Sequence, residues 1–181
     1  MATKKTTSAP ASSAAPAKQP VSPSGTVKLS KFFSLAEMTR SEAAQRGGFD
    51  NTPGAEETAN LTALCQKVLD PLREAKGKPI RVNSGYRGPD ANKAVGGSST
   101  SQHCKGEASD IEIDGYDNKK LAQDIIDMKL PFDQLILEFY VPGDPNSGWV
   151  HVSHKKGGKQ RGEVLRAVRE GGKTAYKPGL G

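Results

Sequence analysis

Three short segments in the second half of this 181-residue chain alternate apolar and polar side chains with a period of two. They cover residues 108–113, 134–140 and 149–153. Such alternation is typical of half-buried β-strands that place one face on a core. Segments with helical spacing come before and between these strands, which can pair as hairpins, so the sequence favours an α+β fold.

The expected helices have recognisable starts and ends. Residues 34–37 read Ser-Leu-Ala-Glu, a capping box that predicts a helix from about residue 35. Asp117 is expected to cap another helix. A further helix is predicted from a single apolar stripe, with Pro71 expected to kink it and Gly77 to end it; the stripe consists of Leu61, Leu64, Val68, Leu69 and Leu72.

The first and last parts of the chain differ from the middle. Residues 1–25 contain four prolines among Ala, Ser, Thr and Lys and have no apolar period, so we expect residues 1–31 to be a disordered arm. We expect one folded domain over 32–171 and a short basic tail over 172–181. Within that domain, residues 164–168 are expected to add an edge strand or a short helix.

Charge is unevenly distributed. The net charge of +6 comes from the ends, because residues 32–154 contain 13 basic and 18 acidic residues. A nucleic-acid-binding domain would place positive charge and aromatic side chains on its folded surface, so this class is disfavoured. The basic ends are either solubilising or attach the protein to an anionic polymer or surface.

A candidate metal site involves two histidines and one aspartate. His103 precedes Asp110 by seven residues, and Asp110 opens an apolar strand where an unpaired charge would be costly. His151 shares a strand face with Trp149 and Ser153. A metal would satisfy all three side chains, and two His with one carboxylate suit Zn²⁺ with an open fourth position. An ordinary hydrogen bond between His103 and Asp110 is the simpler alternative.

These motifs resemble the zinc D-Ala-D-Ala carboxypeptidase family, which includes phage L-alanyl-D-glutamate endopeptidases and is related to hedgehog and lysostaphin-type peptidases. The resemblance lies in Ser101-x-His103-x-x-Gly106-x-Ala108-x-Asp110 and Trp149-x-His151-x-Ser153, with further likeness in 51–73 and 84–97. It covers about residues 32–154. It implies a small antiparallel sheet flanked by helices and one zinc ion held by His103, Asp110 and His151.

The resemblance also implies substrate contacts. Arg87 would lie near the substrate and pair with a carboxylate or oxyanion, because a guanidinium fork fits a carboxylate in a bidentate manner. Ser101 and Gln102 would hydrogen-bond the substrate or the groups behind the metal ligands. The alternatives are a surface arginine for Arg87 and simple loop capping for the other two.

One departure from the family pattern concerns the catalytic base. Many relatives have an acidic residue three positions before the second histidine, where this chain has Gly148. Glu138 is the preferred replacement, because an acid in so apolar a strand should have a raised pKa that suits a general base. Asp144 is the second candidate. His154 could donate a proton, and Cys104 could be a thiolate ligand, although an inert thiol is the simpler interpretation.

The resulting expectation is a monomeric zinc peptidase that cleaves the peptide stem of peptidoglycan. Lys4 and Lys5 are followed by no apolar segment, and no apolar run approaches 18 residues, so neither a secretory signal nor a membrane-spanning helix is expected. Synthesis in the cytoplasm followed by action on the wall would fit a phage endolysin or a virion component. A non-catalytic wall-binding or virion structural protein is the alternative.

Overall fold

The computed structural model describes residues 27–181, and the expected arm over 1–31 therefore lies mostly outside the described residues. Its last five residues, 27–31, are described, and Leu29 is buried in the core. Ordered structure thus begins before the expected boundary at Phe32, because the apolar Leu29 side chain has a place to pack.

Helices precede the sheet. They are α1 (Leu35–Met38), α2 (Glu42–Gly47), α3 (Ala55–Leu64), a π-helical turn (Cys65–Leu69), α4 (Asp70–Lys76), α5 (Pro89–Ala94), a 3-10 helix η2 (Gln102–Lys105) and α6 (Asn118–Asp127). The Ser34 hydroxyl accepts a hydrogen bond from the Glu37 N–H, and the Asp117 carboxylate caps α6, which confirms both predicted helix starts. None of these helices, within residues 27–181, is long and apolar enough to cross a membrane.

Just before Pro71, where a kink is expected, the helix contains a π-helical turn. This turn lies immediately before α4, whose first turn contains Pro71. Proline has no N–H to continue the helical ladder and its ring crowds the carbonyl four residues earlier, so a wider turn relieves the conflict. The helix ends at Gly77, whose φ of 61° is left-handed, as the sequence predicted.

The strands of the described chain form one six-stranded sheet with the order β1-β2-β4-β3-β5-β6. The strands are β1 (Arg81–Ser84), β2 (Ala108–Glu112), β3 (Gln134–Glu138), β4 (Trp149–Ser153), β5 (Glu163–Glu170) and β6 (Lys173–Pro178). Every neighbouring pair is antiparallel except β3 and β5, which are parallel. The expected α+β class with a mostly antiparallel sheet is therefore confirmed.

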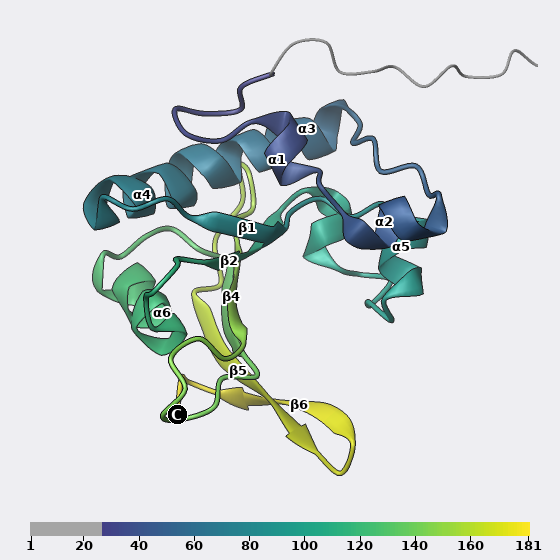
Figure 1. Ribbon diagram of the computed structural model, residues 1–181. Coiled ribbons are helices and arrows are strands. Elements are labelled where there is room, and N and C mark those ends of the chain that lie inside the picture. The colour runs from purple at the N-terminus through teal and green to yellow at the C-terminus, as the bar shows by residue number, and fades with distance from the viewer. Residues whose placement is uncertain (1–26) are drawn as a thin grey trace, which may run out of the picture.

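The two faces of the central strands differ. Leu135 and Leu137 of β3 and Val150 and Val152 of β4 are buried in the same core as the apolar stripe of α3 and α4. On the opposite face Ile136, Glu138, Trp149 and His151 line a cleft. In Figure 1, α3 and α4 extend across the top of the sheet and α6 lies beside it, while the β5–β6 hairpin projects at the other end.

The expected basic tail over 172–181 is wrong. Lys173–Pro178 form β6, which pairs with β5 from Glu170 to Leu165. Residues 164–168 belong to β5, so the strand is the correct one of the two predicted alternatives. It is not an edge strand, because β6 pairs with it on its outer side. The backbone N–H and C=O groups of β6 form hydrogen bonds with β5. The side chains of β6 are mostly exposed and polar, so the segment has little of the apolar pattern that predicts a strand.

Candidate metal centre and cleft

His103 is positioned by the 3-10 helix η2. The Ser101 hydroxyl accepts a hydrogen bond from the His103 N–H, and Gly106 ends the turn with a φ of 67°. A Cβ at Gly106 would lie 2.4 Å from the Glu57 carbonyl oxygen, so the turn can approach α3 this closely only with glycine. This close packing fixes the loop that carries His103.

Asp110 and His151 are brought together by strand register. They are direct partners in the antiparallel β2–β4 pair, with both side chains on the cleft face. Cross-strand partners have Cβ atoms about 4.5–5.5 Å apart, which puts a carboxylate and an imidazole within reach of each other. His103, Asp110 and His151 are all buried, with exposed fractions of 5%, 8% and 6%.

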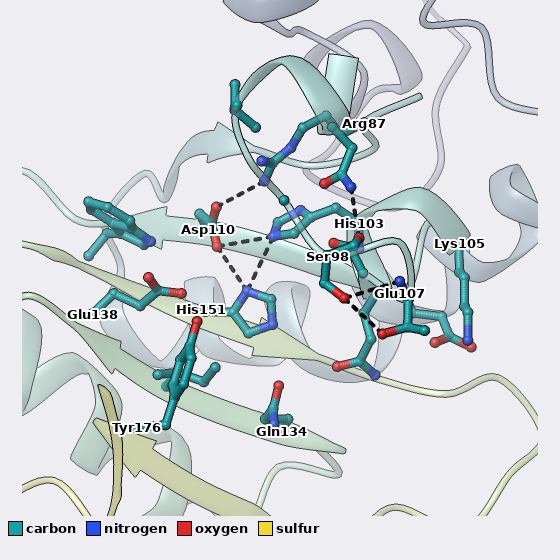
Figure 2. Close-up of a pocket in the computed structure, with 18 of the residues that line it drawn as sticks. Arg87, Ser98, His103, Lys105, Glu107, Asp110, Gln134, Glu138, His151 and Tyr176 are labelled. Atoms are coloured by element: carbon teal, nitrogen blue, oxygen red, sulfur yellow. Dashed lines mark hydrogen bonds and ion pairs between the residues drawn. The ribbon is translucent and has the colours of Figure 1, made fainter. Parts of the chain in front are cut away.

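The three side chains fit a metal ion. His151 Nδ1 lies 2.9 Å from Asp110 Oδ1, His103 Nε2 lies 3.3 Å from the same oxygen, and the two nitrogens are 3.2 Å apart (Figure 2). Ligands about 2.0–2.1 Å from a tetrahedral zinc ion would be about 3.3 Å apart. One ion can therefore contact all three donor atoms with only small adjustments, and these residues form a group of potential metal ligands.

Neighbouring groups favour the protonation states in which His103 and Asp110 can bind a metal ion. His103 Nδ1 lies 2.8 Å from the Gly85 carbonyl oxygen, which can accept a hydrogen bond from an Nδ1–H and so leave Nε2 free to bind a metal. Burial alone would raise the pKa of Asp110, but the charges and hydrogen bonds of His103 and His151 outweigh it and hold this pKa well below its usual range. Asp110 is therefore a carboxylate at neutral pH.

Glu138 stands one strand away from the donors. It pairs with Trp149 in the β3–β4 register and lines the cleft beside His151. Burial, with the nearby negative charge of Asp110, raises the pKa of Glu138 to about 7, against the opposing effects of His151 and Arg87. A carboxyl group that titrates near neutrality suits proton transfer.

Gly148 cannot carry a side chain in this fold. Its φ is 66°, and a Cβ there would lie 1.9 Å from the Glu138 carbonyl oxygen. An acidic residue at this position would clash with the backbone of β3. A carboxylate that faces this cleft must therefore come from another position.

The predicted substrate-binding residues all line the cleft but already have partners. Arg87 Nη2 lies 3.8 Å from Asp110 Oδ2, and its side chain is 17% exposed, so it is no ordinary surface arginine. Ser101 caps the turn of His103, and the Gln102 amide donates a hydrogen bond of 3.1 Å to Asp133.

The remaining candidates point elsewhere. His154 is buried with Nδ1 2.6 Å from the Pro131 carbonyl oxygen and is absent from the cleft lining. Asp144 lies in an exposed turn, where its carboxylate accepts a hydrogen bond from the Asn146 N–H. Cys104 lies outside the donor group, and burial raises the pKa of its thiol, which favours an inert thiol over a ligand.

Sequence reasoning missed several parts of the cleft, which has a volume of about 630 Å³. Asp133 is fully buried at one end, where Arg161 Nη2 lies 2.7 Å and Lys155 Nζ 3.3 Å from its carboxylate. Tyr176 and Thr174 reach the cleft from β6. Their sequence signals are the alternation in 173–178 and the Gly171–Gly172 pair before it, which forms a two-residue hairpin turn.

Two comparisons with known proteins agree with this geometry. Residues 31–153 match the family model for peptidase M15. The chain is also 39% identical over 92 residues to a zinc D-Ala-D-Ala carboxypeptidase from Streptomyces albus G. That alignment covers 50% of this chain and 35% of the relative, so the chain spans about a third of the relative's length. Because the family match extends over more than half of the residues and includes the whole donor group, the chain belongs to the peptidase M15 family.

Proposed function

We propose that this protein is a zinc peptidase that hydrolyses a peptide bond in the stem peptide of bacterial peptidoglycan. The observation that carries this proposal is the buried group of His103, Asp110 and His151 in a cleft that also contains Glu138. The similar Streptomyces protein is a zinc D-Ala-D-Ala carboxypeptidase, which supports both the metal and the substrate class.

His103 Nε2, Asp110 Oδ1 and His151 Nδ1 would hold one zinc ion per chain. When bound, zinc supplies Lewis-acid polarisation and lowers the pKa of a water molecule to about 7. Asp110 contributes the negative charge, and the Gly85 carbonyl keeps the His103 ring in the required orientation.

Glu138 acts as the general base. It takes a proton from the attacking water and can return it to the amine that leaves, so the cleaved bond gives a carboxylate and an amine. Its raised pKa matches both directions of transfer near neutral pH. Its place on β3 lets it face the donors from the side of the cleft.

Arg87 binds a carboxylate of the substrate. Its Nε is buried without a partner within residues 27–181, as is the indole Nε1 of Trp149 in the same cleft. A buried N–H without an acceptor costs about 1–3 kcal/mol, so these donors favour a ligand with acceptor oxygens. The free carboxylates of a stem peptide have that chemistry.

Ser101 and Gln102 form the wall of the cleft next to His103. Their side chains already hold the turn and Asp133, so they would contact the substrate with their remaining hydrogen-bonding capacity: a hydroxyl donor at Ser101 and the amide oxygen at Gln102. Their part in binding is therefore secondary to that of Arg87.

We further propose that the protein acts on the cell wall as a phage endolysin or as a virion component. The basic ends support attachment to an anionic wall or envelope surface. On the β5–β6 hairpin, Arg169 adds positive charge beside Phe139, which lines the cleft. We expect a monomer that is made in the cytoplasm and reaches the wall after release.

A non-catalytic wall-binding protein is the alternative, favoured by the glycine at position 148. Mass spectrometry of peptidoglycan fragments after digestion separates the two and identifies the bond that is cut. The wild type should release new peptide ends, and His103→Ala should release none. Intact fragments with wild-type, zinc-loaded protein would favour the non-catalytic alternative.

A further inference from the structure

We propose that Tyr176 is a catalytic residue whose phenol hydroxyl donates a hydrogen bond to the carbonyl oxygen of the peptide bond being cleaved. This inference rests on the proposed peptidase function. Tyr176 lies in β6, beyond the residues 31–153 that match the family model. The donor thus comes from a segment to which that match assigns no role.

The sheet aligns Tyr176 with the general base. Glu138 pairs with Ala167 in the β3–β5 register, and Ala167 pairs with Tyr176 in the β5–β6 register. Directly paired residues point to the same face, so Glu138 and Tyr176 lie two strands apart, about 10 Å between backbones. The residue between them is alanine, which is 1% exposed and too small to separate the two longer side chains.

Tyr176 also faces the metal donors. Its ring rises from the sheet into the cleft with its oxygen directed towards His151 and Glu138, on the side opposite Arg87 (Figure 2). A substrate whose carboxylate is held by Arg87 and whose scissile bond lies at the donor group would therefore meet Tyr176 on the other side. The two residues bracket the reacting bond.

The hydroxyl is available as a donor. Tyr176 is 57% exposed, and within residues 27–181 its hydroxyl has no hydrogen-bond partner. By contrast, the Tyr140 hydroxyl donates to Asp117 and the Tyr116 hydroxyl to Asp124. Partial burial and the negative charges of Glu138 and Asp110 raise the pKa of Tyr176, so it keeps its proton at neutral pH.

Such a donor would add to the polarisation that a bound zinc ion supplies. Negative charge grows on the carbonyl oxygen as water attacks, and a fixed O–H dipole stabilises that charge without transferring a proton. Loss of one donor of this kind typically lowers the turnover rate by about a hundredfold or more. Since Tyr176 is half exposed to water, we expect a smaller effect, about tenfold to a hundredfold.

The test compares Tyr176→Phe with Tyr140→Phe in the full-length, zinc-loaded protein acting on a soluble stem peptide. Tyr140→Phe removes a phenol hydroxyl outside the cleft and should leave kcat unchanged. Tyr176→Phe should lower kcat about tenfold to a hundredfold while KM stays within about twofold, with unchanged zinc content and melting temperature. Because phenylalanine keeps the ring on β6, the variant should fold normally.

Three results would overturn this role of Tyr176. One is an unchanged kcat, and another is a higher KM at unchanged kcat, since the hydroxyl would then bind ground and transition states alike. The third is a kcat of Tyr176→Phe that is lowered at neutral pH but equals the wild-type kcat at alkaline pH. Tyr176 would then act only by changing the pKa of Glu138. Failure of the peptidase function itself looks different: the wild type would leave the stem peptide uncut.

Discussion

At the scale of single residues, Glu138 is the group that we propose as the general base. Glu138→Gln keeps the size of the side chain but cannot accept a proton, so activity should fall about a hundredfold to ten-thousandfold. Zinc content, measured by elemental analysis, should not change. Glu74→Gln, on the exposed side of α4, is the matched control. Near-normal turnover of Glu138→Gln would refute the assignment of the base.

The raised pKa of Glu138 gives this residue a measurable pH dependence. The base form is lost as the pH falls through about 7, so the rate should decline on the acid side, and a bound cation moves this decline to lower pH. In metal-free protein the folded state holds the Glu138 proton more tightly than the unfolded chain does. The free energy of unfolding therefore decreases as the pH rises from the unfolded pKa of 4.5 to the folded pKa of about 7.

Thermal unfolding of metal-free protein checks that penalty. Glu138→Gln should melt at a higher temperature than the wild type at pH 8, and the difference should vanish at pH 4, where both side chains are neutral. Equal melting temperatures at pH 8 would show that Glu138 is not desolvated in the folded protein.

Asp110 is the anionic member of the metal group, and its replacement should remove the metal. We expect one zinc ion per wild-type chain and substoichiometric zinc in Asp110→Ala, because two neutral imidazoles bind a dication more weakly than two imidazoles with a carboxylate. Asp114→Ala, an exposed position two residues beyond β2, is the control. Full zinc occupancy in Asp110→Ala would contradict the ligand assignment.

A substitution at Arg87 separates the contribution of the planar guanidinium group to substrate binding from that of its positive charge. Arg87→Lys keeps the charge but loses the planar fork, so kcat/KM should fall about tenfold or more while zinc content stays the same. Arg46→Lys, on the exposed side of α2, should have no effect. If Arg87→Lys matches the wild type in kcat/KM, Arg87 supplies only a positive potential.

At the scale of secondary-structure elements, local sequence patterns predict a strand correctly where the segment itself alternates apolar and polar residues. The alternation in 134–140 and 149–153 predicted β3 and β4, and with them the cleft face that holds Glu138 and His151. Parallel pairing of β3 with β5 is different, because it joins strands 29 residues apart in the direct register of Gln134 with Glu163. No local spacing encodes the β3–β5 pairing, whereas β6 follows β5 through the Gly171–Gly172 hairpin turn, a local signal that the expected tail does not take into account.

The fully buried Asp133 ties three elements together at one end of the cleft. It receives hydrogen bonds from Arg161, two residues before β5, and from Gln102 in η2, and it forms an ion pair with Lys155 after β4. Burial would raise its pKa, but the hydrogen bonds from Arg161 outweigh this and lower the pKa of Asp133 to about 2. Its carboxylate therefore stabilises the folded protein at neutral pH.

Asp133→Asn should lower the free energy of unfolding by about 1–3 kcal/mol at pH 7, since Arg161 and Lys155 are partly exposed and can turn to water. Because the pKa of Asp133 is lower in the folded protein than in the unfolded chain, its carboxylate stabilises the folded state at pH values above the unfolded pKa of 3.8. This stabilisation is lost as the pH falls towards 2. Denaturant titrations at pH 7 and pH 2.5 should show the difference shrinking. A constant difference would mean that packing, not charge, explains the loss.

At the scale of the whole molecule, the C-terminal hairpin belongs to the folded unit and supplies part of the cleft. β6 pairs with β5 over six residues and covers a strand that would otherwise lie at the edge of the sheet. A chain that ends at Gly171 should therefore melt at a lower temperature and, lacking Tyr176, cleave a soluble stem peptide much more slowly. Deletion of residues 1–26 is the matched truncation, and it should leave both the melting temperature and this cleavage unchanged.

The two truncations also separate wall attachment from catalysis. Exposed charges are screened beyond about 8 Å at physiological ionic strength, so attachment through the basic ends should weaken as salt is added. Deleting residues 1–26 removes three lysines and should reduce sedimentation with peptidoglycan at low salt, while cleavage of a small peptide continues at the wild-type rate. If sedimentation is the same with and without these residues at every salt concentration, their charge contributes nothing to attachment, and any remaining electrostatic binding belongs to the hairpin that frames the cleft.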